Sequence, residues 1–219
     1  MTATTRCPIR RRKPNDITPR VPGVFILFYN ISMNTQFFTG AGDGGESKIG
    51  GKTYGKDDAV FKVLGAMDSV NALLGFCRVE SAPQAIPALR EIGNTILKIQ
   101  EIIFIAQAEC AARAFGVSDN TRKILESHIA FLEETIHVID KKMPTLTQFI
   151  IPGGSELSAR FELARVEARR AERSIAGVRE RLALSSEFLT FWNRLSSVLF
   201  ALARYANHAK GILEEHPSY

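Results

Sequence analysis

Apolar residues recur every three or four positions along most of the chain after residue 57, which is the spacing of one face of an α-helix. The pattern is clearest in four sets of residues. These are Ile92, Ile96, Ile99, Ile103 and Ala106; Leu125, Ile129, Leu132, Ile136, Ile139 and Met143; Phe161, Ala164, Ala168, Ala171, Ile175, Val178 and Leu182; and Phe188, Trp192, Leu195, Leu199, Leu202 and Ala206. Each set predicts a helix that packs its apolar face against others.

Helix-breaking residues separate the four sets. The breakers are Pro83, Pro87, Gly116, Pro144, Pro152, Gly153 and Gly154. Ser155 and Ser186, each followed by a glutamate, are expected to be the N-caps of the last two helices. With residues 57–80 as a first helix, the sequence predicts an all-α fold, a five-helix up-and-down bundle. No strand alternation competes with this interpretation.

Composition fits one domain in a reducing compartment. The chain has 219 residues, of which 45% are hydrophobic, so it can bury a core of its own. Cys7, Cys77 and Cys110 form no CxxC pair and are odd in number, which favours a reduced interior over a disulfide scaffold. The apolar run at residues 24–28 is too short to span a bilayer. We therefore expect a cytoplasmic protein without a membrane partner.

The net charge of +5 is concentrated at the N-terminus. Residues 1–32 contain six basic side chains and one acidic side chain, whereas the remainder contains 22 of each. The neutral remainder argues against a nucleic-acid-binding protein, although a basic tail can bind polyanions. We interpret residues 1–32 as a leader that is disordered or not native, and residues 33–215 as the helical domain. A mitochondrial transit peptide is the alternative, with the matrix as the location.

Three polar side chains share one face of the fourth predicted helix. Arg165, Arg169 and Glu172 each follow an apolar position by one residue, so they form a stripe about 100° around the helix from the core. By itself this stripe can be a solvated surface. Arginine is also the side chain best suited to bind a polyphosphate, because its guanidinium is planar, permanently charged and holds its N–H donors in a fixed arrangement.

Residues 39–47, TGAGDGGES, are a second candidate for anion binding. Closely spaced glycines let backbone N–H groups approach an anion, and the hydroxyls of Thr39 and Ser47 can donate to it. Such a cluster can also be an ordinary turn. It is not a Walker P-loop, because no GK[ST] ends it.

These segments together resemble the PduO-type ATP:corrinoid adenosyltransferases. In that family a TGDxG loop, an FILPGG segment, an RxxxRRAER helix and a YLNRLSD-like segment occur in this order. The counterparts here are the loop at residues 39–47, FIIPGG at 149–154, RVEARRAER at 165–173 and FWNRLSS at 191–197.

The resemblance implies a transferase in which cobalt(I) of a reduced cobalamin attacks the 5′ carbon of ATP and triphosphate leaves. It implies ATP, Mg²⁺ and cobalamin as ligands, a homotrimer with shared sites, and as further partners a corrinoid reductase or a B12-dependent acceptor enzyme. The residues that it implies for catalysis are Asp68, Arg165, Arg169 and Asn193. Those implied for ATP binding are Thr39, Gly42, Asp43, Gly45, Ser47, Lys56, Arg165, Arg169, Glu172 and Asn193, and Phe149 is implied for corrinoid binding.

Several positions depart from the family pattern. Gly40 and Val60 stand where the family has basic residues, and Lys62 stands where it has a glutamate. Glu162 replaces a histidine, and Ser197 replaces the aspartate that ends RLSD. These departures leave open a non-catalytic corrinoid- or nucleotide-binding protein. Phe149 can likewise be an ordinary core residue.

Other kinds of site lack the necessary spacing. Glu134 and His137 form a single ExxH, whereas a di-iron bundle needs two such motifs. His128, His208 and His216 have no HExxH or HxH partner. We therefore expect no metal site made by the protein itself, and we interpret His137 as a polar surface residue.

Overall fold

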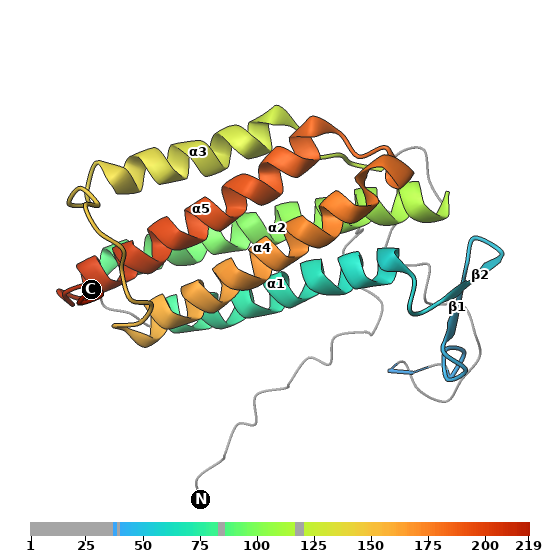
Figure 1. Ribbon diagram of the computed structural model, residues 1–219, viewed down its shortest axis with the longest axis horizontal. Helices are drawn as coiled ribbons and strands as arrows, with labels where there is room; N and C mark the ends of the chain where they lie inside the picture. Colours follow the sequence, from blue (N-terminus) through green and yellow to red (C-terminus); the bar gives the residue numbers. More distant parts are fainter. Residues whose placement is uncertain (1–36, 39, 83–85, 117–120) are drawn as a thin grey trace, which may run out of the picture. The chain divides into compact units, whose positions relative to one another are not determined.

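The computed structural model describes residues 37–38, 40–82, 86–116 and 121–219. These residues contain five α-helices and one two-stranded sheet, in the order β1 (Glu46–Ile49), β2 (Lys52–Gly55), α1 (Ala59–Ser81), α2 (Pro87–Phe115), α3 (Glu126–Asp140), α4 (Glu156–Leu182) and α5 (Ser186–Ala209). Consecutive helices run in alternating directions, as Figure 1 shows. The predicted up-and-down bundle is confirmed. The predictions for residues 1–32, Thr39 and Pro83 lie outside the described residues.

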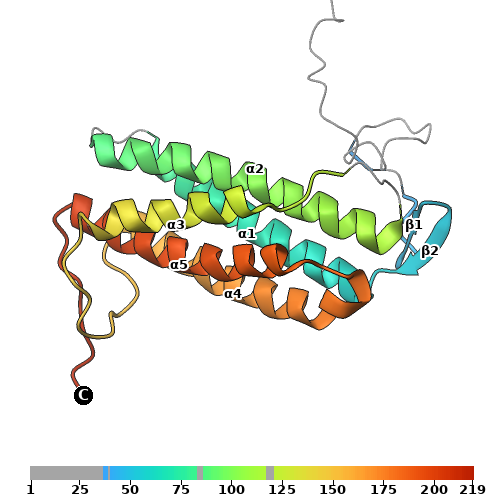
Figure 2. The same ribbon diagram turned by 90° about the horizontal axis from the view of Figure 1, so that it is seen from above.

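The helices pack side by side around a shared core (Figure 2). α4 packs against α1 on one side and α5 on the other, while α2 packs against α1 and α3 packs against α5. The predicted apolar positions on α2, α4 and α5 are all buried, as are Ile129, Leu132 and Ile139 on α3. Leu125 is an exception. It is 56% exposed because it precedes α3 as its N-cap and does not lie on the helix.

Local capping explains where the helices begin. Asp58 accepts a hydrogen bond from the backbone of Val60 at the start of α1, and Ser155 accepts one from Ser158 at the start of α4. The prediction for α5 was wrong by one residue. Ser185 is the N-cap and accepts from Phe188, so that Ser186 is already the first helical residue. Both are serines, and only the backbone conformation distinguishes them.

The β-hairpin was not predicted. β1 and β2 pair antiparallel with Ile49 opposite Lys52, and Gly50 and Gly51 form the turn with φ of 57° and 78°. Two glycines between short strands are a recognised hairpin signal, because both positions of such a turn need a positive φ. The hairpin is fixed to the end of the bundle by Tyr54, whose ring lies 4.9 Å from that of Phe115.

A buried ion pair joins three segments at the end of α2. Glu109 is 2% exposed, and its carboxylate accepts hydrogen bonds from Arg113 Nε at 3.2 Å and from the backbone of Ile124 at 2.8 Å. Arg113 also donates to the carbonyl of Ala183 at 2.7 Å. The pair therefore connects α2 both to the segment before α3 and to the turn between α4 and α5.

α1 is largely apolar, and its apolar residues are spread around the helix. Among the described residues it is the one helix that is long and apolar enough to cross a membrane, with a mean hydropathy of 1.4 over its best window. It packs lengthwise against α2 and α4. It nevertheless leaves Phe76 58% exposed and Val79 72% exposed. An apolar helix with uncovered large side chains is typical of a surface that another molecule covers.

Candidate functional site

The polar stripe on α4 lies where the sequence predicts it. Ala164, Ala168 and Ala171 are fully buried, so the side chains that follow them emerge beside the core. Arg165 is half-buried and donates through Nε to Glu162 at 2.6 Å. Arg169 is exposed and forms no hydrogen bond or ion pair with any described residue. Its guanidinium is therefore available to an anionic ligand.

A hydrogen-bonded network joins this stripe to α5 and α3. Asn193 Nδ2 donates to Glu172 at 2.9 Å, and Asn193 Oδ1 accepts from Arg194 at 3.0 Å. Arg194 also donates through Nε to Glu133 of α3 at 2.7 Å. Both ends of the Asn193 amide are held, so its orientation is fixed before any ligand binds. Glu133 was not predicted, and no local signal identifies it, because only the packing of α3 on α5 brings it to Arg194.

The glycine loop is made of tight turns. The backbone N–H of Asp43 donates to Gly40 at 3.2 Å, and that of Gly45 donates to Gly42 at 3.2 Å. Gly40 and Gly45 have φ of 70° and 79°. Residues other than glycine rarely adopt such φ values, so the backbone of a basic residue at position 40 would be strained here. Ser47 lies in β1 and Asp43 is exposed.

Lys56 closes the glycine loop. Its Nζ donates to the carbonyl of Gly42 at 2.7 Å, and its backbone N–H donates to Gly45 at 2.9 Å. A Cβ added at Gly42 would lie 2.6 Å from the ammonium, so the lysine can reach this carbonyl because position 42 is a glycine. Three of the predicted ATP-binding residues are thus brought together with a cation at their centre.

The N-cap of α1, two residues after Lys56, is connected to the C-terminal end of α4. Arg181 donates to both carboxylate oxygens of Asp58, at 2.7 and 3.4 Å. These hydrogen bonds, together with the one from the backbone of Val60, lower the pKa of Asp58 below its ordinary value. Val60 itself is 2% exposed, so its side chain belongs to the core and cannot contact a ligand.

Phe149 lies at the other end of α4. Its side chain is 81% exposed, so the interpretation of Phe149 as a core residue is wrong. The turn that follows it has Gly153 and Gly154 with φ of 144° and 88°, and Asn207 of α5 fixes this turn. Asn207 Nδ2 donates to Gly153 at 3.0 Å, while its Oδ1 accepts from the backbone of Ser155 at 2.8 Å.

One chain does not assemble all of the predicted residues. α4 has 27 residues, so its ends lie about 40 Å apart. The glycine loop and hairpin lead into α1, whose N-cap Asp58 bonds to Arg181 at one end of α4, whereas the loop with Phe149 precedes the other end (Figure 1). Asp68 of α1 is exposed and has no ion pair with Arg165 or with any other residue that the structure describes.

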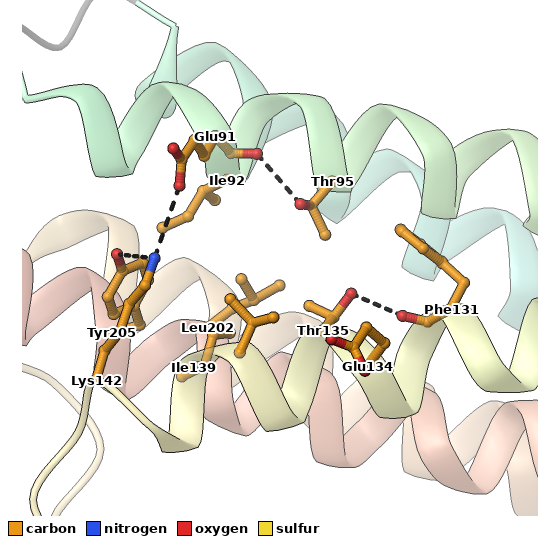
Figure 3. A pocket seen from close by; sticks show the side chains of 11 residues that line it. Glu91, Ile92, Thr95, Phe131, Glu134, Thr135, Ile139, Lys142, Leu202 and Tyr205 are labelled. Carbon is orange, nitrogen blue, oxygen red and sulfur yellow. Dashed lines mark hydrogen bonds and ion pairs between the residues drawn. The ribbon is translucent and has the colours of Figure 1, made fainter.

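A cavity between α2, α3 and α5 contains none of the predicted site residues. It has a volume of about 230 Å³, and Figure 3 shows its polar side chains Glu91, Glu134 and Lys142 around an apolar floor that includes Leu202. Lys142 lies 3.9 Å from Glu91 and donates to Tyr205 at 3.4 Å. Two carboxylates beside one ammonium disfavour a polyphosphate, so this cavity is not an ATP site.

The described residues contain no group of three or more His, Cys, Asp or Glu side chains that could hold a metal ion. His128 instead accepts a hydrogen bond through Nδ1 from the backbone of Leu125 at 3.1 Å and helps to cap α3. Burial lowers the pKa of His128, with a further contribution from Lys98. A backbone N–H only donates, so Nδ1 of His128 is the unprotonated ring nitrogen in this cap.

Comparison with known proteins gives a consistent result. The family model for cobalamin adenosyltransferase matches residues 37–206. The chain is 30% identical over 178 residues to a corrinoid adenosyltransferase of Bacillus subtilis, covering 81% of this chain and 89% of that protein. It is 32% identical over 170 residues to a corrinoid adenosyltransferase of Citrobacter freundii, covering 77% and 93%.

A solved structure shares the fold as well. It is that of a variant PduO-type ATP:corrinoid adenosyltransferase from Lactobacillus reuteri complexed with cobalamin and ATP. The TM-score is 0.75 at 27% identity, and the match covers 84% of this chain and 97% of that chain. The order of motifs, the bundle and these four similarities agree. The chain is therefore a transferase that belongs to the PduO-type cobalamin adenosyltransferase family.

Proposed function

We propose that the protein transfers the 5′-deoxyadenosyl group of ATP to cobalt(I) of cobalamin, forming adenosylcobalamin and releasing triphosphate. The observation that carries this proposal is the network of Glu172, Asn193 and Arg194 beside the unpaired Arg169. The network holds an oriented amide, and Arg169, three residues before Glu172 on the same face of α4, has a free guanidinium. The Lactobacillus reuteri structure to which the chain is similar is complexed with cobalamin and ATP.

The nucleophile in this reaction is cobalt(I) of the substrate, so the protein has to supply positioning and charge. Arg169 is a permanent cation suited to the triphosphate leaving group, whose negative charge grows as the bond to the 5′ carbon breaks. The Lys56 ammonium has three N–H groups, of which one donates to Gly42, so the others can donate to a phosphate chain. Mg²⁺ requires no protein cage, because it commonly binds substrate phosphates together with one or two carboxylates and water.

The proposal includes a site shared between copies of the chain in a homotrimer. The separation of about 40 Å along α4 means that the glycine loop and Phe149 of one chain cannot both contact one ATP–corrinoid pair. A neighbouring copy can supply the missing half. Phe76 and Val79 of α1 and Leu163 and Val166 of α4 are exposed apolar side chains on two adjacent helices, and such a copy would cover them.

Within that assembly we propose that Asp68 of one copy pairs with Arg165 of the next. Arg165 already has Glu162 as a partner on its own helix, at 2.6 Å. Loss of Asp68 therefore leaves the guanidinium paired. We expect Asp68→Ala to cost about 1 to 2 kcal/mol of assembly, which is less than the roughly 3–5 kcal/mol of a buried pair broken from one side.

Direct assays test both parts of the proposal. Purified protein with ATP, Mg²⁺ and chemically reduced cobalamin is expected to form adenosylcobalamin. Arg169→Ala should lose most of this turnover without a change in melting temperature, whereas Arg173→Ala, on the same helix and also exposed, should not. ATP binding without turnover would support a non-catalytic binding protein instead.

Light scattering at micromolar concentration tests the shared site. We expect the mass of a trimer for the wild type and a partial loss of trimer for Asp68→Ala. A wild-type monomer that remains fully active would contradict the shared site.

A further inference from the structure

The segment after α5 folds back along the loop that carries Phe149. α5 ends at Ala209, and Gly211 has a φ of 65°, which reverses the chain direction. The backbone N–H of Ile212 then donates to the carbonyl of Asn207 at 3.0 Å. We call residues 211–216 the strap.

An ion pair fixes the strap to α5. Arg204 forms a bidentate ion pair with Glu214 and donates to both carboxylate oxygens, each at 2.9 Å. The two side chains are only 12% and 16% exposed, so solvent screens the pair little. Arg204 also donates to the carbonyl of Pro144 at 3.4 Å, which is where the loop after α3 begins. One arginine thus holds both the strap and the start of the loop.

Two further contacts join the strap to the backbone of the loop on either side of Ile150. The N–H of Ile151 donates to the carbonyl of Glu215 at 2.8 Å. Nδ1 of His216 lies 2.8 Å from the carbonyl of Phe149. A carbonyl only accepts, so Nδ1 carries the proton and donates.

These contacts matter because the ring of Phe149 cannot be positioned by packing. It is 81% exposed, and Asn207 holds only the later part of the same loop, at Gly153 and Ser155. The conformation of the backbone at Phe149 therefore depends on the strap. The matched family model ends at residue 206, so the strap lies outside the region that the model covers.

We propose that the strap positions Phe149 for the corrinoid, with Glu214 and His216 as positioning residues. This inference rests on the proposed function. The strap contributes no group to the reaction. It does not contact the glycine loop, which precedes α1, whose N-cap Asp58 bonds to Arg181 at the opposite end of α4. Its loss weakens corrinoid binding and leaves ATP binding unchanged.

Amide hydrogen exchange at Ile151 tests the structural step in the full chain. His216→Ala and Glu214→Gln should each accelerate this exchange about fivefold, the effect of losing one hydrogen bond worth about 1 kcal/mol. Tyr219→Ala is the matched control, because Tyr219 is fully exposed and lies just beyond the strap. Equal exchange at Ile151 in all four proteins would overturn the proposal.

Dissociation constants for cob(II)alamin and for ATP test the functional step. The two variants should bind cob(II)alamin about three- to tenfold more weakly and ATP as the wild type does. His216→Asn should restore corrinoid binding, because its amide can donate to the same carbonyl. Unchanged corrinoid binding, or an equal loss for both ligands, would refute the positioning role. If the wild type forms no adenosylcobalamin but the variants still lose corrinoid affinity, the proposed adenosyl transfer is refuted and the positioning role of the strap is supported.

Discussion

Asn193 joins the predicted catalytic stripe to α5, and its replacement by alanine is the sharpest perturbation of the site. The substitution removes the hydrogen bonds of 2.9 Å to Glu172 and 3.0 Å from Arg194. Asn193 is exposed, so water can replace both bonds, and the free energy of unfolding should fall by only about 1 kcal/mol. For a chain of this length that corresponds to a decrease in melting temperature of about 2–4 °C.

The expected effect on catalysis is much larger. The amide is held at both ends before the ligand binds, and removal of one such preorganised donor costs about 100- to 1,000-fold in turnover. Formation of adenosylcobalamin, followed by absorbance with a strong reductant present, measures kcat and KM for ATP. Ser197→Ala, one turn further along α5 and also exposed, is the matched control and should retain activity.

A double-mutant cycle identifies the partner. If Asn193 acts together with Glu172, the Glu172→Ala variant should lose a comparable activity, and the double variant should lose little more than either single one. The reasoning is refuted if Asn193→Ala turns over within about twofold of the wild type. Fully additive losses would also refute it, because they would place the two side chains in separate roles.

Other predictions follow from single contacts. Glu109→Ala leaves its arginine partner without a counter-charge near the core, so urea unfolding should show a loss of roughly 3 kcal/mol. The hydrogen bonds from Arg181 lower the pKa of Asp58 below its ordinary 3.8, so its contribution to stability is complete above about pH 4 and is lost as the pH falls through the lower folded value. Acid unfolding of Asp58→Asn should accordingly show a shallower dependence on pH. We propose that Phe149, the residue implied for corrinoid binding, keeps the lower axial ligand away from cobalt. Phe149→Ala should then retain ATP affinity and melting temperature but lose the four-coordinate spectrum of bound cobalt(II) corrinoid; an unchanged spectrum would exclude this role. Residues 33–219 expressed alone should match the full chain in melting temperature, mass and turnover, and a marked loss in any of these would assign a role to the leader.

The sequence alone determined the bundle and the placement of the stripe on α4. Both depend on residues three or four positions apart, and a helix brings such residues to one face whatever the rest of the chain does. Ala164, Ala168 and Ala171 are therefore buried as predicted, and the side chains that follow them emerge as predicted. The hairpin turn at Gly50 and Gly51 depends on an equally local signal, two successive glycines, and was predictable from the sequence although it was not predicted.

Only the tertiary structure decided which side chains meet. Glu133 reaches Arg194 across 61 residues of sequence, and Asn207 fixes Gly153 across 54, because separate helices pack side by side. The exposure of Phe149 is of the same kind, since an aromatic residue before a turn has no local pattern that marks it as uncovered. Contacts between distant segments depend on helix directions and interhelical distances, and these are fixed by burial of the whole core.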